Sequence, residues 1–335
     1  MSRRAVVTGA GGPEVFSIVD EAPAAPRANE VRIRVAVAGV AFGDVMRRRG
    51  VLAPRKPFTP GYDVAGYVDA VGSSVTELSK GARVAAMMPK AGIGGYADHV
   101  CVPAKRLVRV PDEVPFDEAV CLGLNYITAF QLLNRVAKVS PGQAVLIHGA
   151  AGGVGTALLD LGRLYGLTMY GTASARKHDL VRERGGIPID YRNEDFVDRI
   201  AELEPEGVAV VFDGVGGDNL RRSYKTLSRR GMLVAFGVSG DVDSGLSGVA
   251  RGMVTYAGLK SRFNRKRTRF YAITASPGSW PAQCREDWQE LLDMRRDGKL
   301  SPVIGARIPL AQVSEAHELI DRAGVVGKIV MTCVA

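Results

Sequence analysis

The spacing of hydrophobic residues divides the chain into regions with different predicted elements. From Glu30, the run EVRIRVAVAGVAF alternates apolar and polar residues for part of its length, which is typical of a half-buried strand. Two further runs, GYDVAGYVDAVG and GARVAAMM, follow with glycines between them. Roughly the first 120 residues are therefore predicted to be rich in β-structure.

From about residue 144 the pattern changes to strands that alternate with short helices. The run AVLIHG is followed by TALLDLGRLY, whose Ala157, Leu158, Leu161 and Leu164 fall on one helical face. Further strand-like runs are LTMYGTAS, IPIDY, VAVVFDGVGG and GMLVAFG. This alternation predicts a parallel, doubly wound sheet.

Near Tyr271 the alternation weakens. A helix is predicted from about Gln283 to Arg296, and the strand-like run GKIVMTCVA ends the chain. Periodicity leaves open whether these last residues form a third unit or return to the first region.

Length and composition bound the class of protein. A chain of 335 residues is too long for one ordinary core, so two domains are expected. No apolar run is long enough to span a bilayer, and the start MSRRAVVTGAGG lacks the apolar stretch of a signal peptide, so we expect a cytoplasmic protein. The four cysteines lie far apart without a CxxC pair, which argues against disulfides and a Cys-rich zinc site.

The net charge of +9 raises the question of an anionic partner. Part of the excess lies in KSRFNRKRTRF, from Lys260 to Phe270. Basic residues with interleaved aromatics are compatible with nucleic-acid binding, whereas the alternative is a solvated loop. No known nucleic-acid module accompanies the run, so we favour the loop.

The stretch HGAAGGVG, His148 to Gly155, lies between a predicted strand and a predicted helix. Backbone N–H groups at such a turn, together with the helix N-terminus, favour a pyrophosphate. The GxGxxG pattern has an alanine in place of its first glycine. Within a βαβαβ series it still predicts a dinucleotide site, with contacts from Ala150, Ala151, Gly152, Gly153 and Val154.

The end of the next strand predicts which dinucleotide binds. NAD sites usually place Asp or Glu there to hold the ribose 2′-hydroxyl. Ala173 takes that position here and is followed by Ser174, Arg176 and Lys177. A hydroxyl and two cations suit a 2′-phosphate, whereas the alternative is a helix start with Ser174 as N-cap and surface cations. The missing acid favours NADPH.

Seven motifs occur in an order that carries a family resemblance: GYDVAGYVDAVGSSV, NYITAFQLL, VLIHGAAGGVG, GTASARKHDL, IDYRNEDF, VVFDGVGG and GKIVM. The chain resembles the medium-chain dehydrogenase/reductase superfamily, in particular its zinc-free quinone oxidoreductase branch and the synaptic-vesicle-membrane-protein-like subgroup. The resemblance implies an α/β fold: a GroES-like, β-rich catalytic domain of residues 1–122 and 273–335, with a Rossmann domain of residues 123–272 inserted as a doubly wound parallel sheet. It also implies an active site between the domains and a homodimer.

The resemblance further implies that no metal is bound. Zinc-dependent members use a Cys, a His and a further Cys or Asp as catalytic ligands. Ala41, Tyr62 and Leu124 align with those positions, and none of them is a usual zinc ligand. The structural lobe with four cysteines is absent as well.

Zinc-free relatives commonly reduce quinones or the C=C bond of enones, so the resemblance implies NADPH-dependent hydride transfer to a small molecule. Many of them carry Asn at the position of Ala41, and several enoyl reductases carry Tyr near Met46. This chain keeps only Asp44 of that segment. Tyr62 is predicted as the proton donor and Asp44 as the residue that orients a donor, whereas a packing role for Tyr62 and a structural role for Asp44 are the alternatives.

Other site residues follow from the same resemblance. Asn125 and Tyr126 match residues beside the nicotinamide, and Thr128, Phe236 and Gly237 match positions that approach it through the backbone. Tyr191 matches a residue at the phosphate or adenosine end, and Gly214 with Val215 matches a loop near the ribose. An apolar substrate pocket is predicted from Phe42, Met46, Tyr96, Tyr126 and Phe263.

Two other functions stay open. A specialised biosynthetic reductase or cyclase on the same fold, inactive on simple quinones, would explain the altered positions Ala41 and Met46. A nucleotide- or RNA-binding interaction protein would use the basic run instead, and its binding would depend steeply on salt.

Overall fold

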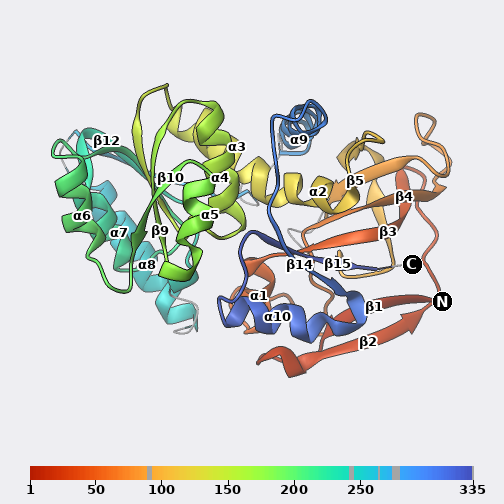
Figure 1. Cartoon of the computed structure of the whole chain (residues 1–335). Coiled ribbons are helices and arrows are strands. Elements are labelled where there is room, and N and C mark those ends of the chain that lie inside the picture. The colour runs from red at the N-terminus through yellow and green to blue at the C-terminus, as the bar shows by residue number, and fades with distance from the viewer. Residues whose placement is uncertain (89–92, 241–244, 263–264, 274–279, 334–335) are drawn as a thin grey trace. The chain divides into compact units, whose positions relative to one another are not determined.

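The computed structural model describes residues 1–88, 93–240, 245–262, 265–273 and 280–333. The chain forms two compact units, one of Met1–Ile127 with Ser276–Ala335 and one of Thr128–Ala275 (Figure 1). The domain boundaries expected from the sequence, after residues 122 and 272, stay predictions.

The first unit is built on a seven-stranded, largely antiparallel sheet. Its strands follow the order β14 (Ile304–Pro309), β15 (Lys328–Thr332), β3 (Glu30–Val40), β4 (Asp63–Val71), β5 (Arg83–Met87) and β7 (Leu107–Arg109), with β6 (His99–Pro103) also paired to β3. A separate antiparallel pair is formed by β1 (Ser2–Val7) and β2 (Phe16–Glu21). Because β15 pairs with β3, the last residues return to the first region, which periodicity alone left open.

The alternation read from the sequence explains how β3 builds the core of this unit. Val31, Ile33 and Val35 are fully buried, whereas the polar residues between them are half-buried. They pack with apolar residues of β4, β5, β6 and β15. The helices of the unit are α1 (Phe42–Arg48), α2 (Phe116–Cys121), α9 (Trp280–Arg296) and α10 (Val313–Asp321). Shorter helical segments are the 3-10 turns η1 (Pro13–Val15), η2 (Ala104–Arg106) and η7 (Leu310–Gln312) and the π-helical η3 (Leu122–Tyr126).

A buried ion pair joins β4 to β15 in this unit. The Lys328 ammonium lies 3.1 Å and 3.2 Å from the two carboxylate oxygens of Asp63, and both side chains are almost completely buried. Gly39 on β3 leaves the room for it, because a Cβ there would lie 2.1 Å from the Asp63 Oδ1. The same carboxylate accepts the N–H of Leu124 at 2.9 Å. Asp63 therefore connects the C-terminal strand with the segment after α2.

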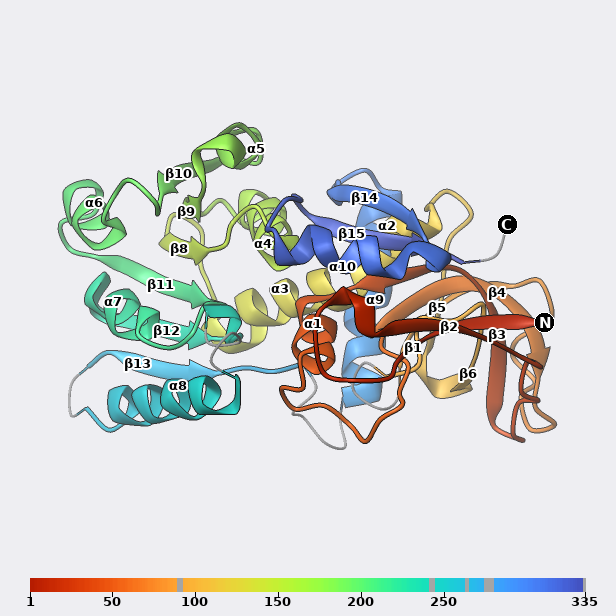
Figure 2. The same cartoon turned by 90° about the horizontal axis from the view of Figure 1, so that it is seen from below.

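The second unit is a six-stranded, fully parallel sheet with helices on both faces (Figures 1 and 2). Its strands follow the order β10 (Gly186–Asp190), β9 (Thr168–Ala173), β8 (Ala144–His148), β11 (Val208–Asp213), β12 (Leu227–Ala235) and β13 (Arg267–Phe270). The helical segments are α3 (Ile127–Gln131), η4 (Leu132–Ala137), α4 (Gly153–Leu164), η5 (Ala175–Lys177), α5 (His178–Glu183), α6 (Phe196–Leu203), α7 (Asn219–Lys225) and α8 (Gly245–Lys260).

This strand order confirms the predicted doubly wound sheet. From β8 the chain winds outward through β9 and β10, and it then returns to the other side of β8 for β11, β12 and β13. The winding therefore reverses between β8 and β11. In sheets of this kind, ligands bind beyond the carboxyl ends of the strands at that reversal.

We expect the buried ion pair to be essential for the stability of the first unit. Lys328→Met leaves the Asp63 carboxylate buried without a counter-charge, which costs about 3–5 kcal/mol of the free energy of unfolding. Urea denaturation followed by circular dichroism measures this loss. The control is Lys299→Met, because Lys299 pairs with Asp297 on the surface and such pairs contribute at most about 1 kcal/mol. Equal stability of the two variants would contradict this role of Asp63 and Lys328.

Candidate active site

The glycine-rich loop follows β8 at the point where the winding of the sheet reverses. Gly149 has φ +66°, a conformation that favours glycine. A Cβ on Gly155 would lie 2.2 Å from the Gly149 carbonyl oxygen, so only glycine allows α4 to begin this close to the strand. The first turn of α4 leaves backbone N–H groups without acceptors inside the helix. The loop therefore has the shape and the donors that a pyrophosphate requires.

Ala150, which takes the place of the first glycine, is accommodated by a glycine on the next strand. Ala150 is fully buried, and its N–H donates to the Thr172 carbonyl oxygen at 3.0 Å. A Cβ on Gly171 would lie only 2.7 Å from the Ala150 methyl carbon. The volume of the alanine is thus offset by the missing side chain on β9, and the departure from GxGxxG does not disturb the turn.

Cations gather where β9 and β10 end side by side. Ala173 and Asp190 are register partners on these two strands. Burial, and then the charges of Arg176 and Arg192, lower the pKa of Lys177. The sequence analysis missed Arg192, although a cation two residues after the end of β10 was a usable signal. Three positive charges that act on one another at the end of two adjacent strands favour an anionic ligand.

The loops after β11 and β12 contact each other closely. A Cβ on Gly237 would lie 2.5 Å from the Gly214 carbonyl oxygen, and the Phe236 ring covers Gly214. The Phe236 N–H donates to the Asp213 carbonyl oxygen at 2.9 Å, and Val215 accepts an N–H from Gly240 at 2.8 Å. The structure therefore brings the predicted ribose loop of Gly214 and Val215 into contact with Phe236 and Gly237, which the sequence assigned to the nicotinamide.

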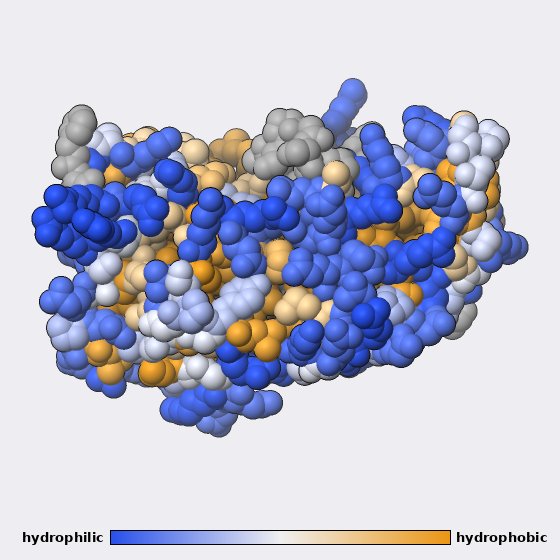
Figure 3. Space-filling model, turned by 90° about the horizontal axis from the view of Figure 1, so that it is seen from above, coloured by the Kyte–Doolittle hydropathy of each residue, from blue (hydrophilic) through white to orange (hydrophobic). Residues whose placement is uncertain are grey.

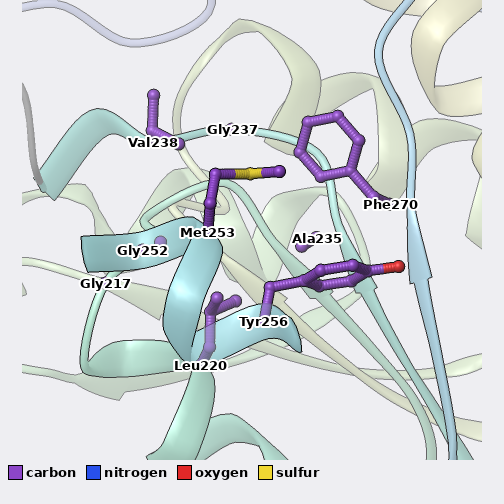
Figure 4. Close-up of a pocket in the computed structure, with 10 residues that line it drawn as sticks. Gly217, Leu220, Ala235, Gly237, Val238, Gly252, Met253, Tyr256 and Phe270 are labelled. Carbon is purple, nitrogen blue, oxygen red and sulfur yellow. The ribbon is translucent and has the colours of Figure 1, made fainter. Parts of the chain in front are cut away.

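A small apolar pocket lies beside these loops, between α8 and the ends of β12 and β13 (Figure 4). Its lining includes Leu220, Val238, Met253, Tyr256 and Phe270, with several glycines. Of the residues predicted to form the substrate pocket, none that the structure describes belongs to it.

In the first unit, a buried carboxylate organises the region around Tyr62. Asp44 accepts the N–H of Ala41 at 3.0 Å, the N–H of Gly61 at 3.0 Å and the hydroxyl of Tyr96 at 2.9 Å. Burial raises the pKa of Asp44 to about 6, although these hydrogen bonds oppose the shift. Asp44 thus joins the start of α1 to Gly61, the residue before Tyr62. The residue after Tyr62 is Asp63, which Lys328 anchors.

Tyr62 lies almost buried between these two anchors, with 8% of its surface exposed. Burial raises the pKa of its hydroxyl to about 12, and the charge of Arg47 acts in the opposite direction. The Arg47 guanidinium lies 4.7 Å from the centre of the Tyr62 ring. Gly43 makes room for the hydroxyl, because a Cβ there would lie 2.4 Å from the phenol oxygen. Sequence reasoning did not identify Arg47. The available signal was its spacing, because Arg47 lies one helical turn after Gly43 on α1.

The residues predicted to line the substrate pocket differ in accessibility. Phe42 is 36% exposed and Met46 is half-buried, both on α1. Tyr126 is buried, and Tyr96 is completely buried with its hydroxyl on Asp44, so its place is in the core beside Asp44. Phe263 lies outside the described residues.

The predicted cofactor residues outside the loops are found in different surroundings. Asn125 and Thr128 are buried, with 7% and 6% of their surfaces exposed. Tyr191 is half exposed directly after β10, with the Arg192 guanidinium 5.9 Å from its ring centre. Ser174 is buried at the end of β9 and makes no capping hydrogen bond through its side chain.

Comparison with known proteins identifies the family. Residues 27–112 match the alcohol dehydrogenase GroES-like domain, and residues 187–331 match the zinc-binding dehydrogenase family. The chain is 31% identical to the synaptic vesicle membrane protein VAT-1 homolog of Danio rerio, over 98% of this chain and 70% of that protein. It is 30% identical to human quinone oxidoreductase, over 96% of this chain and 94% of that enzyme. The chain belongs to the quinone oxidoreductase-like branch of the medium-chain dehydrogenase/reductase superfamily.

Solved structures agree with this assignment. The Escherichia coli quinone oxidoreductase complexed with NADPH superimposes with a TM-score of 0.88 at 28% identity, covering 99% of this chain and all of that one. The human VAT-1 homolog-like protein superimposes with a TM-score of 0.85 at 28% identity, covering 99% and 98%. By sequence, the match to the rat VAT-1 homolog spans 59% of that protein.

One matching family is named for zinc, but the three positions that align with catalytic zinc ligands do not carry residues that suit a zinc ion. Ala41, Tyr62 and Leu124 offer a methyl group, a phenol buried under Arg47 and an isobutyl group. A catalytic zinc needs three ligands from His, Cys, Asp or Glu. Across the described part of the chain, no group of three such residues is arranged to hold a metal ion.

Two further expectations from the sequence concern a membrane span and the basic run of residues 260–270. In the part of the chain that the structure describes, no helix is long and apolar enough to cross a membrane. The basic run is not wholly a loop: it begins at Lys260, the last residue of α8, and its last four residues form β13, which pairs with β12. Arg262 and Lys266 lie 5.5 Å and 5.2 Å from the ring centre of Tyr224. At least these two cations of the run contact the protein itself.

We expect Asp44 to make stability depend on pH in a characteristic direction. Its pKa of about 6 in the folded chain exceeds the ordinary value of 3.8, so folding favours its protonated form. The contribution is present below about pH 4 and is lost as the pH rises through 6, by about 3 kcal/mol. Asp44→Asn removes this titration.

Urea unfolding of both proteins between about pH 4 and pH 8 measures the effect as the difference between their stabilities. The wild type should lose stability relative to Asp44→Asn across this interval. A difference that does not change with pH would show that the pKa of Asp44 is the same in the folded and the unfolded chain.

Proposed function

We propose that this protein reduces a quinone, or the activated C=C bond of an enone or enoyl compound, with NADPH and without zinc. Bound NADPH supplies the hydride. The family membership supports an oxidoreductase, and relatives named quinone oxidoreductase support the substrate class. The complex of the Escherichia coli relative with NADPH supports the cofactor.

The observation that carries the choice of NADPH is the cation cluster at the ends of β9 and β10. Arg176 and Lys177 follow the end of β9, and Arg192 follows the end of the neighbouring strand β10. The charges of both arginines act on Lys177, and Ala173 stands where an NAD-binding protein would place a carboxylate. Charge-assisted hydrogen bonds from these groups and from the Ser174 hydroxyl would hold a 2′-phosphate. The N–H groups at the start of α4 would hold the pyrophosphate.

We assign the remaining contacts from the predicted site. The loop residues Gly214 and Val215 would border the ribose, and the backbone of Phe236, Gly237 and Thr128 would approach the nicotinamide. Asn125 would lie beside the same ring, and Tyr191 would border the adenosine end. Phe42 and Met46 are the most accessible of the proposed substrate contacts. The predicted homodimer and cytoplasmic location stay predictions.

We expect Arg192→Gln to weaken NADPH binding and leave NADH binding unchanged. Loss of one charged hydrogen bond to the 2′-phosphate costs about 1.5–3 kcal/mol, or roughly tenfold to a hundredfold in Kd. Fluorescence titration with each cofactor measures both values. The matched control is Arg182→Gln, since Arg182 pairs with Asp179 on the surface of α5. If Arg192→Gln weakens both cofactors equally, Arg192 does not read the 2′-phosphate.

The proton needed after hydride transfer would come from Tyr62. Its raised pKa keeps the hydroxyl protonated at neutral pH, so a proton is available for the oxyanion that develops on the substrate. The charge of Arg47 would stabilise the phenolate that remains. Asp44 does not need to transfer a proton, because its carboxylate holds the N–H groups of Ala41 and Gly61. Asp44 is therefore assigned as a positioning residue.

We expect Tyr62→Phe to lower kcat by about a hundredfold, since a positioned general acid contributes at least that much. The Kd of NADPH should not change. NADPH oxidation is followed by absorbance with a panel of quinones and α,β-unsaturated ketones, after dialysis against a chelator that would remove zinc. The control is Tyr67→Phe, because Tyr67 on β4 packs against Phe116. An unchanged kcat in Tyr62→Phe would show that solvent supplies the proton.

The dialysis tests the second part of the proposal. Loss of NADPH oxidation by the wild type after dialysis would contradict zinc independence.

A second candidate is a specialised biosynthetic reductase or cyclase that does not turn over simple quinones. It is favoured by Ala41, a methyl-bearing N-cap of α1 where many quinone-reducing relatives carry an amide side chain. Firm NADPH binding without turnover on the panel would support this function over the first.

A further inference from the structure

Four side chains of the second unit form an unbroken line of hydrogen bonds from one predicted cofactor loop to another. Thr172 lies near the end of β9, His148 ends β8, Asp213 ends β11 and Ser223 lies on α7. The three strands are neighbours in the sheet, and β8 and β11 flank the reversal of the winding (Figure 2). All four residues are buried, with at most 5% of their surfaces exposed.

At one end, the line holds the glycine-rich loop. The Thr172 hydroxyl oxygen accepts the N–H of Gly149 at 3.2 Å and lies 3.1 Å from the Nδ1 of His148. The carbonyl oxygen of Thr172 accepts the N–H of Ala150 at 3.0 Å. Thr172 therefore determines where the loop leaves β8.

At the other end, the line holds the loop after β11. One Asp213 oxygen accepts the N–H groups of Val215 and Gly216 at 2.8 Å and 3.0 Å. Its second oxygen accepts the Ser223 hydroxyl at 2.6 Å and the amide of Asn219 at 3.0 Å. The Ser223 oxygen in turn lies 3.0 Å from the Nε2 of His148.

These distances determine the direction of every hydrogen bond. Two oxygens 2.6 Å apart need a hydrogen between them, so the single hydrogen of Ser223 points to Asp213. The Ser223 oxygen must then accept a hydrogen from the Nε2 of His148. A neutral imidazole carries one hydrogen, so Nδ1 is bare and accepts the Thr172 hydroxyl. The order is therefore Thr172 to His148 to Ser223 to Asp213.

The surroundings of His148 favour the neutral ring that this order requires. Burial lowers its pKa, and the charge of Arg222 acts in the same direction, whereas Asp213 acts against it. The ring also meets the edge of Phe196, with 4.7 Å between the ring centres. A second proton on Nδ1 would point at the Thr172 oxygen and force the threonine hydroxyl to turn away.

We propose that His148, as the neutral Nε2–H tautomer, is a positioning residue that couples the glycine-rich loop to the loop of Val215 and Gly216, so that both loops bind the dinucleotide as one unit. This inference rests on the proposed cofactor site. The line contacts the parts of the site that NADPH and NADH share, so it sets affinity for both cofactors in the same proportion.

Two substitutions remove single hydroxyls from the line. Thr172→Val keeps the shape of the side chain, and Ser223→Ala removes the link between His148 and Asp213. Each should weaken NADPH and NADH binding by about tenfold, the equivalent of one lost hydrogen bond. The double variant should also bind about tenfold more weakly, because the second change acts on a line that is already broken. Thr172→Ser, which keeps the hydroxyl, should bind almost as the wild type does.

The control is Thr226→Val, because the buried Thr226 hydroxyl donates to the Ser223 carbonyl oxygen outside the line. It should lose stability to urea but keep cofactor affinity. Nitrogen-15 NMR of the histidine rings should show His148 protonated on Nε2 alone at neutral pH. Either an Nδ1–H tautomer or a charged ring would overturn the assigned direction.

The outcomes separate this inference from the proposed function. A wild type that binds neither dinucleotide would contradict the proposed cofactor site itself. A wild type that binds both, with variants that bind equally well, would overturn the coupling alone. About a hundredfold loss in the double variant would also overturn it, because independent effects multiply. The coupling is supported only if the losses of affinity in the two single variants do not add in the double variant and are the same for NADPH and NADH.

Discussion

The buried pair of Asp63 and Lys328 is the interaction on which the first unit depends. It connects residues 265 positions apart in the sequence and joins the C-terminal strand to a sheet formed by the N-terminal region. Two charges in an apolar core are stable only when they neutralise each other, so the core of this unit requires both parts of the chain. The same carboxylate holds Leu124, and it follows Tyr62 directly in the sequence. The local geometry at Tyr62 therefore depends on this pair.

Asp44 shows what burial does to a carboxylate that lacks such a partner. Its three hydrogen-bond donors are uncharged, so they do not outweigh the loss of water, and its pKa rises to about 6. Asp63 has such a partner, because the Lys328 ammonium lies 3.1 Å away. The two carboxylates lie on either side of Tyr62 in the hydrogen-bond network, one anchored by a cation and the other by backbone groups. This arrangement anchors the backbone on both sides of Tyr62.

The second unit solves a different problem, which is to bring backbone N–H groups and cations to one edge of a parallel sheet. The close approach of α4 to β8 requires glycine at Gly155, whereas Ala150 is tolerated because Gly171 leaves space for its methyl group. Parallel strands end at the same edge, so the residues after β9 and β10 are neighbours although 16 positions separate Arg176 from Arg192. A predicted phosphate site thus results from strand order more than from any single motif.

The sequence by itself determined the two kinds of sheet, the glycine-rich turn and the missing acid after the second strand of the parallel unit. These features are local: periodicity reports which face of an element is buried, and glycines report where the backbone approaches closely. It also pointed to Tyr62 and Asp44, through a family resemblance.

Only the tertiary structure decided which distant residues meet. The pairing of Asp63 with Lys328, the position of Arg192 beside Lys177, the placement of Arg47 over Tyr62 and the core position of Tyr96 all depend on contacts between separate elements. The line from Thr172 to Asp213 has no sequence signature, because its members come from three strands and a helix. Hydrogen-bond direction and pKa depend on distance and burial, and both are properties of the folded chain alone.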